Sequence, residues 1–178
     1  DVVPAQPGML EVRMHYPAIH QSNHRGIHFM QGWCEFLGMA LGIDVPLLTN
    51  RPRLYFGTPE PEQPGYWLVC SGGKHDFTNK LWPYYQDVVN RLVGRVRFIQ
   101  VGLAVDNPPL WGTHGRMGKT TLRELFDLVR RSDGVLCGVS LLMHVAAALE
   151  KPAVVIAGGR EPVAWNAYPK QQYVHTVG

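Results

Sequence analysis

The sequence has few cysteines, few charged residues and no long apolar run, and each shortage excludes a class of protein. Its three cysteines, Cys34, Cys70 and Cys137, lie far apart, which argues against a disulfide framework or a zinc knuckle and favours buried, reduced thiols. No apolar run reaches the roughly 18 residues that a membrane span requires, and the first residues lack the pattern of a signal peptide. Charged residues make up 17% and hydrophobic residues 46% of the 178 residues, so we expect a buried core rather than disorder.

Basic clusters and metal-binding motifs are also lacking. The formal net charge is +3, and the basic residues are scattered apart from the pair Arg130–Arg131, so the basic stripe of a nucleic-acid-binding surface is missing. A small anionic ligand such as a nucleoside diphosphate fits this charge equally well. There is no Asp-x-Asp motif, and four histidines near the start have spacings that suit no standard ligand set: His15, His20, His24 and His28. We therefore expect neither nucleic acid nor a bound metal.

A stretch rich in Pro and Gly, residues 54–65, divides the chain and is typical of a linker or long crossover. Before it, Leu10–Tyr16 has the pattern of a strand, and Ile27–Leu41 is apolar enough for a mostly buried helix that ends at Gly42. After it, residues 66–178 show a regular alternation of apolar strands and amphipathic helices. The second part therefore has the pattern of a complete domain, whereas the first does not.

The alternation after residue 66 predicts an α/β fold. The predicted strands are Tyr66–Ser71, Val96–Val101, Gly134–Cys137 and Ala153–Ala157, and the predicted helices are Leu81–Val93, Thr121–Arg131 and Leu141–Leu149. Continuously apolar strands separated by helices indicate a parallel sheet covered on both faces, hence a Rossmann-like, doubly wound domain. Ligands of such sheets bind beyond the carboxyl ends of the strands, so the candidate residues are those that follow each strand.

The first candidate segment is the glycine-containing turn after the first predicted strand. Ser71, Gly72 and Gly73 bring backbone N–H groups within reach of an anion, and Lys80 adds positive charge near the start of the next helix. A plain turn with a solvated lysine explains the same residues equally well.

The second segment, Gly118-Lys119-Thr120, is similar to a P-loop. The P-loop pattern requires glycine at position 113, where this chain has Thr113, and the segment lies well past the preceding predicted strand. A nucleoside triphosphatase is therefore disfavoured. A better account makes Thr120 or Thr121 the N-cap of the following helix, with Glu124 as its capping-box partner.

The third segment is a short strand that opens into a helix at Ser140. The first turn of that helix presents N–H groups to an anion, with Ser140 as the N-cap. His144 follows one turn later. On an apolar helix, a lone histidine is more often a hydrogen-bonded core residue than a ligand contact, so we favour that interpretation of His144 from the sequence alone.

Together these segments resemble the C-terminal domain of the glycosyltransferase family that contains the ADP-heptose–lipopolysaccharide heptosyltransferases, glycosyltransferase family 9. The Lys-x-Trp-Pro helix start of the family corresponds to residues 80–83, its Gly-Lys-Thr-Ser-Leu-x-Glu-Leu stretch to residues 118–125, and its Asp-Ser-Gly-x-x-His-x-Ala-Ala-Ala signature to residues 139–148. The resemblance covers roughly residues 64–165. It implies that residues 66–178 are the nucleotide-sugar-binding half of a GT-B enzyme.

The resemblance also implies a function. The protein would transfer a sugar, from an ADP-heptose-like donor, to a glycan or protein acceptor, without a metal cofactor. It would act in bacterial lipopolysaccharide biosynthesis, in the cytoplasm or at the inner membrane surface. The implied donor-diphosphate residues are Ser71, Gly72, Gly73, Lys80, Ser140, Leu141 and His144, and the implied nucleoside residues are Asp106, Lys119 and Thr120.

Two departures from the family pattern leave the donor open. Val139 and Leu141 replace the Asp and Gly of the helix-start signature, which removes an acceptor and hinders close backbone approach. Either the donor differs from ADP-heptose, or the chain is a degenerate, non-catalytic binding or interaction module.

GT-B enzymes place the acceptor, and usually the catalytic base, on an N-terminal Rossmann domain. Residues 1–53 resemble only the tail of such an acceptor domain, and the chain begins at Asp1 rather than Met. We therefore expect a longer polypeptide or a separate N-terminal domain, and we assign no catalytic residue.

Overall fold

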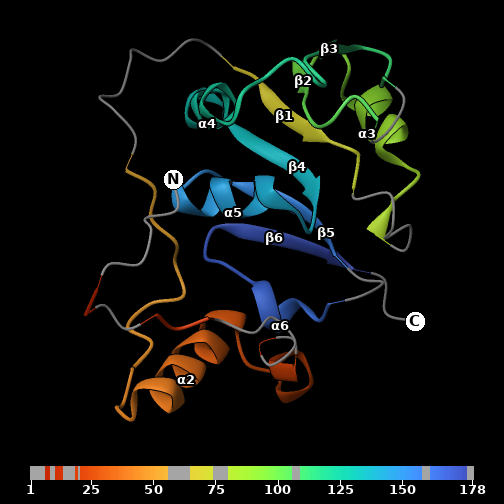
Figure 1. Ribbon diagram of the computed structural model, residues 1–178. Coiled ribbons are helices and arrows are strands. Elements are labelled where there is room, and N and C mark those ends of the chain that lie inside the picture. The colour runs from red at the N-terminus through yellow and green to blue at the C-terminus, as the bar shows by residue number, and fades with distance from the viewer. Residues whose placement is uncertain are drawn as a thin grey trace. The chain divides into compact units, whose positions relative to one another are not determined.

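The computed structural model describes residues 7–8, 11–13, 19, 21–55, 65–73, 80–105, 109–157 and 161–175. These residues form two compact units (Figure 1). The first comprises Asp1–Asn50 together with Ala164–Asn166, and the second comprises Arg51–Val163 together with Ala167–Gly178. Of the strand predicted over Leu10–Tyr16, only residues 11–13 are described, and they have no regular secondary structure. Most of the predicted linker, residues 56–64, lies outside the described residues, as do His15 and His20.

The first unit is built on η1 (Gln21–Arg25) and the helix α2 (Phe29–Leu41). His28 is the N-cap of α2 and accepts a hydrogen bond from the Met30 N–H through Nδ1, at 3.3 Å. The helix ends at Gly42, as the sequence predicts, because this residue adopts a left-handed conformation with φ 67° that suits glycine. The prediction of a mostly buried helix is wrong, since Gly32 is its only buried residue. No described strand of this unit covers the apolar face of α2.

The second unit contains a six-stranded, all-parallel sheet with the order β3-β2-β1-β4-β5-β6. The strands are β1 (Trp67–Cys70), β2 (Phe98–Gln100), β3 (Thr113–Gly115), β4 (Gly134–Gly138), β5 (Ala153–Ala157) and β6 (Gln171–His175). The helices are α3 (Tyr85–Leu92), α4 (Leu122–Arg131), α5 (Leu141–Ala148) and the short α6 (Val163–Asn166), of which the last three residues belong to the first unit. The prediction of a Rossmann-like parallel sheet is confirmed.

Helices cover both faces of this sheet. On one face, α3 packs its buried side chains Tyr85 and Val89 on Val69, Phe98 and Leu136. The crossover through α3 leads from β1 to β2, and the crossover through α5 leads from β4 to β5, in the opposite direction along the sheet. Because crossovers between parallel strands are right-handed, α5 covers the other face. There α5 packs on β4, on β5 and against α4 (Figure 1). The strands read as continuous apolar runs because both of their faces are buried.

Three short elements are absent from the sequence prediction, and the helix after β1 is shorter than predicted. β3, α6 and β6 escape detection because they are short or polar: β3 reads Thr-His-Gly, and β6 begins with two glutamines. The helix predicted from Leu81 begins at Tyr85 instead. Pro83 accounts for part of this difference, because a proline disfavours helical conformation in the residue before it, Trp82.

The capping box predicted at the start of α4 is confirmed, with Thr121 as the N-cap. The Glu124 N–H donates to the Thr121 hydroxyl at 3.2 Å, and the Thr121 N–H donates to the Glu124 carboxylate at 2.7 Å. The backbone hydrogen bond from Thr121 lowers the pKa of Glu124. Two N–H groups at the start of α4 are thereby satisfied within the chain.

We expect Thr121→Ala to lower the free energy of unfolding by about 1 kcal/mol, because the N-cap side chain is lost. Chemical denaturation measures the effect. Thr120→Ala is the matched control, since the neighbouring threonine has no part in the capping box. An equal loss in both variants contradicts the assignment.

The contribution of Glu124 to the stability of the folded chain decreases at low pH. Since its pKa is lowered in the folded chain, the contribution is complete above the ordinary value of 4.5 and is lost as the pH falls through the lowered pKa. The stability difference between the wild type and Glu124→Gln should therefore shrink as the solution is acidified below that value.

Candidate functional site

The order of the strands reverses between β1 and β4, and in an open parallel sheet such a reversal marks the crevice where ligands bind. Residues 71–73 follow β1 and residues 139–140 follow β4, so both predicted segments lie at the carboxyl edge of adjacent strands. Lys80 also lies at this edge. A Cβ atom placed on Gly138, the last residue of β4, would be 3.7 Å from the Lys80 carbonyl oxygen. The structure thus brings the three predicted diphosphate segments together.

The turn after β1 presents its backbone rather than its serine. Ser71 is only 5% exposed, and its hydroxyl accepts a hydrogen bond of 3.1 Å from the Gln100 side-chain amide. Gly72 and Gly73 are partly exposed, and a Cβ atom on Gly73 would lie 3.5 Å from the Leu81 side chain. The groups of this turn that reach the surface are therefore those of the two glycines.

Gln100, which the sequence prediction did not single out, links the end of β2 with the turn after β1 and with the start of β3. It is fully buried at the end of β2. Its carboxamide oxygen accepts hydrogen bonds from the Leu110 N–H at 2.7 Å and the Thr113 hydroxyl at 3.4 Å, while its NH₂ group donates to Ser71. The signal that could have identified it is a glutamine at the end of an otherwise apolar strand, since a buried carboxamide requires partners.

Lys80 forms an ion pair with Glu161, a second residue that the sequence analysis missed. The Lys80 ammonium lies 2.7 Å from the Glu161 carboxylate, and the two side chains are 20% and 6% exposed. Glu161 lies beyond β5, at the same carboxyl edge of the sheet. Its sequence context gives no sign of this role, because a lone glutamate in a loop is usually solvated. An incoming diphosphate must either displace this carboxylate from Lys80 or share the ammonium with it.

The start of α5 offers backbone N–H groups that its N-cap side chain does not satisfy. Ser140 is the N-cap residue, as predicted, but its side chain makes no capping hydrogen bond. Its buried hydroxyl lies instead beside the Cys137 thiol. Burial raises the pKa of this thiol, and the smaller effect of the Ser140 hydroxyl lowers it. Leu141, the first residue of the helix, is 51% exposed. The partial positive charge of the helix start is therefore available at the surface, next to an apolar side chain.

His144 lies one turn further along α5 and is hydrogen-bonded, as a core histidine would be. Its Nδ1 is 2.8 Å from the Tyr168 hydroxyl, and the two rings meet edge to face with their centroids 5.6 Å apart. The imidazole is partly exposed, whereas Tyr168 is 5% exposed. Nothing in the sequence pairs these residues, because Tyr168 follows β5 in a segment with no regular pattern.

The cysteines are free thiols, as the sequence predicts, but only Cys137 is buried. Cys34 and Cys70 are partly exposed, so the expectation of three buried thiols is wrong for these two. Burial raises the pKa of Cys137, and it also raises the pKa of the Tyr85 phenol. Neither group is therefore activated as a nucleophile.

The segment predicted to border the nucleoside lies between β3 and α4. The Gly118 N–H donates to the Gly102 carbonyl at 2.8 Å, which places the segment beside the residues that follow β2. Glycine is required at position 118, since φ is 64° and a Cβ atom would lie 2.8 Å from the Ala104 side chain. Lys119 and Thr120 come next, with Lys119 exposed. Asp106 lies outside the described residues.

Contrary to the prediction from the sequence, the P-loop-like segment closely follows a strand. A strand does precede the segment directly, because β3 ends at Gly115. The segment still differs from a P-loop, since Lys119 lies before the N-cap Thr121 and the N–H groups of Thr121 and Glu124 are engaged in the capping box. The phosphate-binding geometry of a P-loop is therefore not formed here.

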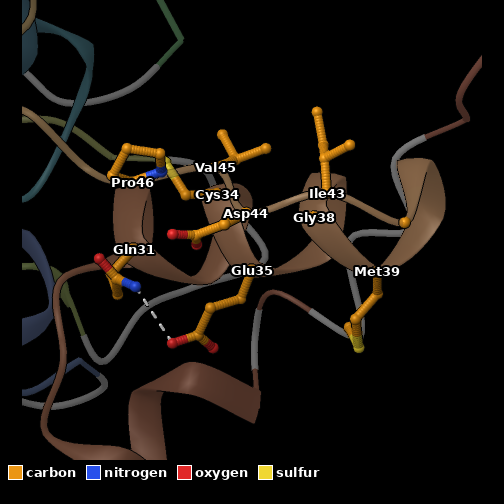
Figure 2. Close-up of a pocket in the computed structure, with 10 residues that line it drawn as sticks. Gln31, Cys34, Glu35, Gly38, Met39, Ile43, Asp44, Val45 and Pro46 are labelled. Carbon is orange, nitrogen blue, oxygen red and sulfur yellow. Dashed lines mark hydrogen bonds between the residues drawn. The ribbon is translucent and has the colours of Figure 1, made fainter.

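A separate hollow of about 580 Å³ lies within the first unit, between α2 and the residues that follow it (Figure 2). Glu35, Asp44 and Ile43 are among its lining residues. Figure 2 shows Gln31 directed toward Glu35, to which it donates a hydrogen bond of 3.2 Å. Arg25 also pairs with Glu35, at 2.6 Å, and lowers its pKa. None of the residues predicted to bind the donor lines this hollow.

Within the described ranges, no three His, Cys, Asp or Glu side chains gather in a way that could hold a metal ion. No helix there has both the length and the apolar character that crossing a bilayer requires.

Comparison with known proteins agrees with the resemblance seen in the motifs. The family model for glycosyltransferase family 9 (heptosyltransferase) matches residues 114–177. No curated protein sequence matches the chain. The resemblance to this family is confirmed over the matched residues, which include the segment around Lys119, the helix start at Ser140 and His144.

Solved structures of heptosyltransferases share the fold. The iron-containing, dodecameric TibC of enterotoxigenic E. coli, solved with ADP-D-beta-D-heptose, is 23% identical with a TM-score of 0.61 over 83% of this chain and 39% of that one. E. coli heptosyltransferase WaaC with ADP is 16% identical, with a TM-score of 0.61 over 85% of this chain and 51% of that one. A family 9 glycosyltransferase of Veillonella parvula is 14% identical, with a TM-score of 0.60 over 84% and 49%. The chain thus spans about half the length of these structures or less.

The Lys80–Glu161 pair gives a prediction for stability. Lys80→Met keeps the aliphatic stem but removes the ammonium that pairs with the buried Glu161 carboxylate. We expect a loss of about 3 kcal/mol in the free energy of unfolding. Adding Glu161→Gln should restore most of it, because the buried charge is removed as well. Denaturant titration of the two single variants and the double variant measures the coupling, and additive effects would argue against a coupled pair.

Proposed function

We propose that this chain is the donor-binding part of a glycosyltransferase that uses a nucleoside-diphosphate sugar, with an ADP-heptose-like donor as the first candidate. A single observation carries the proposal. Lys80, whose ammonium pairs with Glu161, lies at the same sheet edge as Gly72, Gly73 and the start of α5, at the point where the strand order reverses. Support comes from the family match over residues 114–177 and from the fold shared with heptosyltransferases.

These groups suit a leaving diphosphate. Transfer of the sugar breaks the bond between its anomeric carbon and a phosphate oxygen, so negative charge grows on the diphosphate in the transition state. A lysine ammonium and the N–H groups of a helix start stabilise such charge most effectively where they are fixed in advance. The Glu161 carboxylate fixes Lys80 in this way, since the ion pair holds the ammonium at the carboxyl edge of the sheet.

The nucleoside would lie on the β2 and β3 side of the same edge, beside Lys119 and Thr120. Gly118 holds this segment against the residues that follow β2. Asp106 remains a candidate for the ribose hydroxyls. The donor would thus extend along the sheet edge, with its base beyond β2 and its diphosphate between β1 and β4.

The acceptor and the catalytic base belong to the part of the enzyme that we propose lies outside residues 66–178. Glycosyl transfer to a hydroxyl requires a group that takes the proton of that hydroxyl. We propose that an N-terminal Rossmann domain supplies it, with residues 1–53 as the tail of that domain and residues 54–65 as the linker. A glycan or a protein side chain is the proposed acceptor. We place the reaction in the cytoplasm or at the inner membrane surface, which suits three free thiols.

One observation favours a second function, that of a non-catalytic binding module. Leu141 stands half-exposed at the first position of α5, where its side chain limits how closely an anion approaches the helix start. Donor hydrolysis or sugar transfer by the complete protein would rule this alternative out.

The donor proposal predicts that ADP raises the melting temperature of the 178-residue chain. At a concentration about a hundred times the Kd, ligand linkage adds about 2.7 kcal/mol, which corresponds to a rise on the order of 5–10 °C for a chain of this size. Differential scanning fluorimetry with ADP, UDP and GDP measures it. We expect the rise to persist in EDTA, because the proposed cation is Lys80.

Lys80→Met/Glu161→Gln is the test variant, since it removes the proposed phosphate contact without leaving a buried charge. We expect the rise to disappear. Lys170→Met/Glu150→Gln is the matched control, because it removes an exposed lysine–glutamate pair before β6, together with the contact of Glu150 to Arg51, at the opposite edge of the sheet. The absence of any shift with all three diphosphates at millimolar concentration, in the wild type, would count decisively against the proposal.

A further inference from the structure

His144 belongs to a closed set of hydrogen bonds that connects α5 with the residues leading into β6. The Tyr168 hydroxyl meets His144 Nδ1 at 2.8 Å, and the Tyr168 N–H donates to the Tyr173 hydroxyl at 3.3 Å. The Tyr173 hydroxyl donates to the Gln171 carboxamide oxygen at 2.5 Å. Gln171 returns to α5, since its NH₂ group donates to the Met143 carbonyl at 2.8 Å.

This set holds Tyr168 firmly against one face of the imidazole-bearing helix. Tyr168 and Gln171 are buried, and Met143 is fully buried. The edge-to-face contact between the rings fixes the orientation of the imidazole as well as the distance to Nδ1. A side chain held at both its ring and one nitrogen keeps a single orientation, which is the usual property of a positioned binding group.

The chemistry of the two groups decides which of them donates. A phenol is a good donor and a weak acceptor, whereas the lone-pair nitrogen of a neutral imidazole is a strong acceptor. The favoured pairing is therefore Tyr168 O–H to His144 Nδ1. Burial raises the pKa of Tyr168, which keeps its proton in place at neutral pH. Since one ring nitrogen of neutral imidazole accepts and the other carries the hydrogen, Nε2 then carries it.

We propose that Tyr168 is a positioning residue that fixes His144 as the Nε2–H tautomer, so that the imidazole donates a hydrogen bond to the diphosphate of the donor. The inference rests on the proposed function for its ligand, but the tautomer is a property of the chain alone. In the opposite tautomer Nε2 would present a lone pair, which repels a phosphate oxygen. Tyr168 thus decides whether His144 supports or opposes anion binding at the start of α5.

The tautomer is measured by ¹⁵N NMR on the chain labelled at histidine, because the two kinds of ring nitrogen have well-separated shifts. The spectrum is recorded at about pH 8.5, above the ordinary imidazole pKa of about 6.5. His144→Gln identifies the signals of His144 among those of the eight histidines. We expect the hydrogen on Nε2 in the wild type. A hydrogen on Nδ1 overturns the proposal.

Tyr168→Phe removes the hydroxyl and keeps the ring. We expect the ratio of the tautomers to shift toward Nδ1–H by about fivefold, the effect of one ordinary hydrogen bond. Tyr66→Phe is the matched control, since it removes another buried hydroxyl, one that donates to the Leu128 carbonyl instead. The control should leave the ratio unchanged. An unchanged ratio in Tyr168→Phe overturns the proposal, and so does an equal shift in both variants.

Binding of ADP, measured by calorimetry, separates this inference from the function on which it rests. We expect the Kd to rise in Tyr168→Phe by the factor by which the measured Nε2–H population falls, and to stay constant in Tyr66→Phe. If the wild type binds no nucleoside diphosphate while the tautomer shift is observed, the proposed function and the ligand contact fail together and the role of Tyr168 in setting the tautomer stands. If ADP binds the wild type and Tyr168→Phe equally well although the spectra show that the Nε2–H population has fallen, His144 is no donor to the diphosphate and the positioning role is overturned.

Discussion

The pairing of β1 with β4 is the constraint on which the candidate site depends. The two strands are adjacent in the sheet and parallel over four residue pairs, from Trp67 with Gly134 to Cys70 with Cys137. The chain winds outward in one direction from β1 and in the other from β4, so none of the described helices crosses the edge where these two strands end. The turn after β1 and the start of α5, far apart in the sequence, therefore meet there. Gly134 permits the pairing, because a Cβ atom at this position would lie 2.7 Å from the Trp67 indole.

Among the residues that the structure describes at this edge, the charge of Lys80 is balanced within the chain. Glu161 neutralises Lys80, and the helix start contributes only partial charge. A buried ion pair of this kind adds little stability in itself, since desolvation offsets most of the attraction. Its structural effect is to fix the ammonium at one place. The groups that carry charge are thus rigid, while the glycines of the first turn leave room for backbone approach.

The fold was more predictable from the sequence than the site. Apolar runs in the sequence predict the buried strands β1, β2, β4 and β5, and the spacing of Thr121 and Glu124 predicts the capping box of α4. The edge strands β3 and β6 are not visible, because half-exposed strands carry polar residues and resemble loops. For the site, motifs indicate Lys80, Ser140 and His144, but the partners of Lys80 and His144 come from loops whose positions only the folded sheet defines. Burial of the Ser71 hydroxyl likewise depends on Gln100, a contact across strands that no local pattern encodes.

The contacts of Gln100 limit how this domain could be altered. One carboxamide serves the turn after β1, the approach to β3 and β3 itself, through Ser71, Leu110 and Thr113. These segments cannot be exchanged one at a time with those of another protein. Each replacement would remove one hydrogen-bond partner from the buried Gln100 carboxamide, while the other segments still hold that carboxamide in place. Any change to this region, by selection or in the laboratory, would have to alter these three segments and the glutamine together.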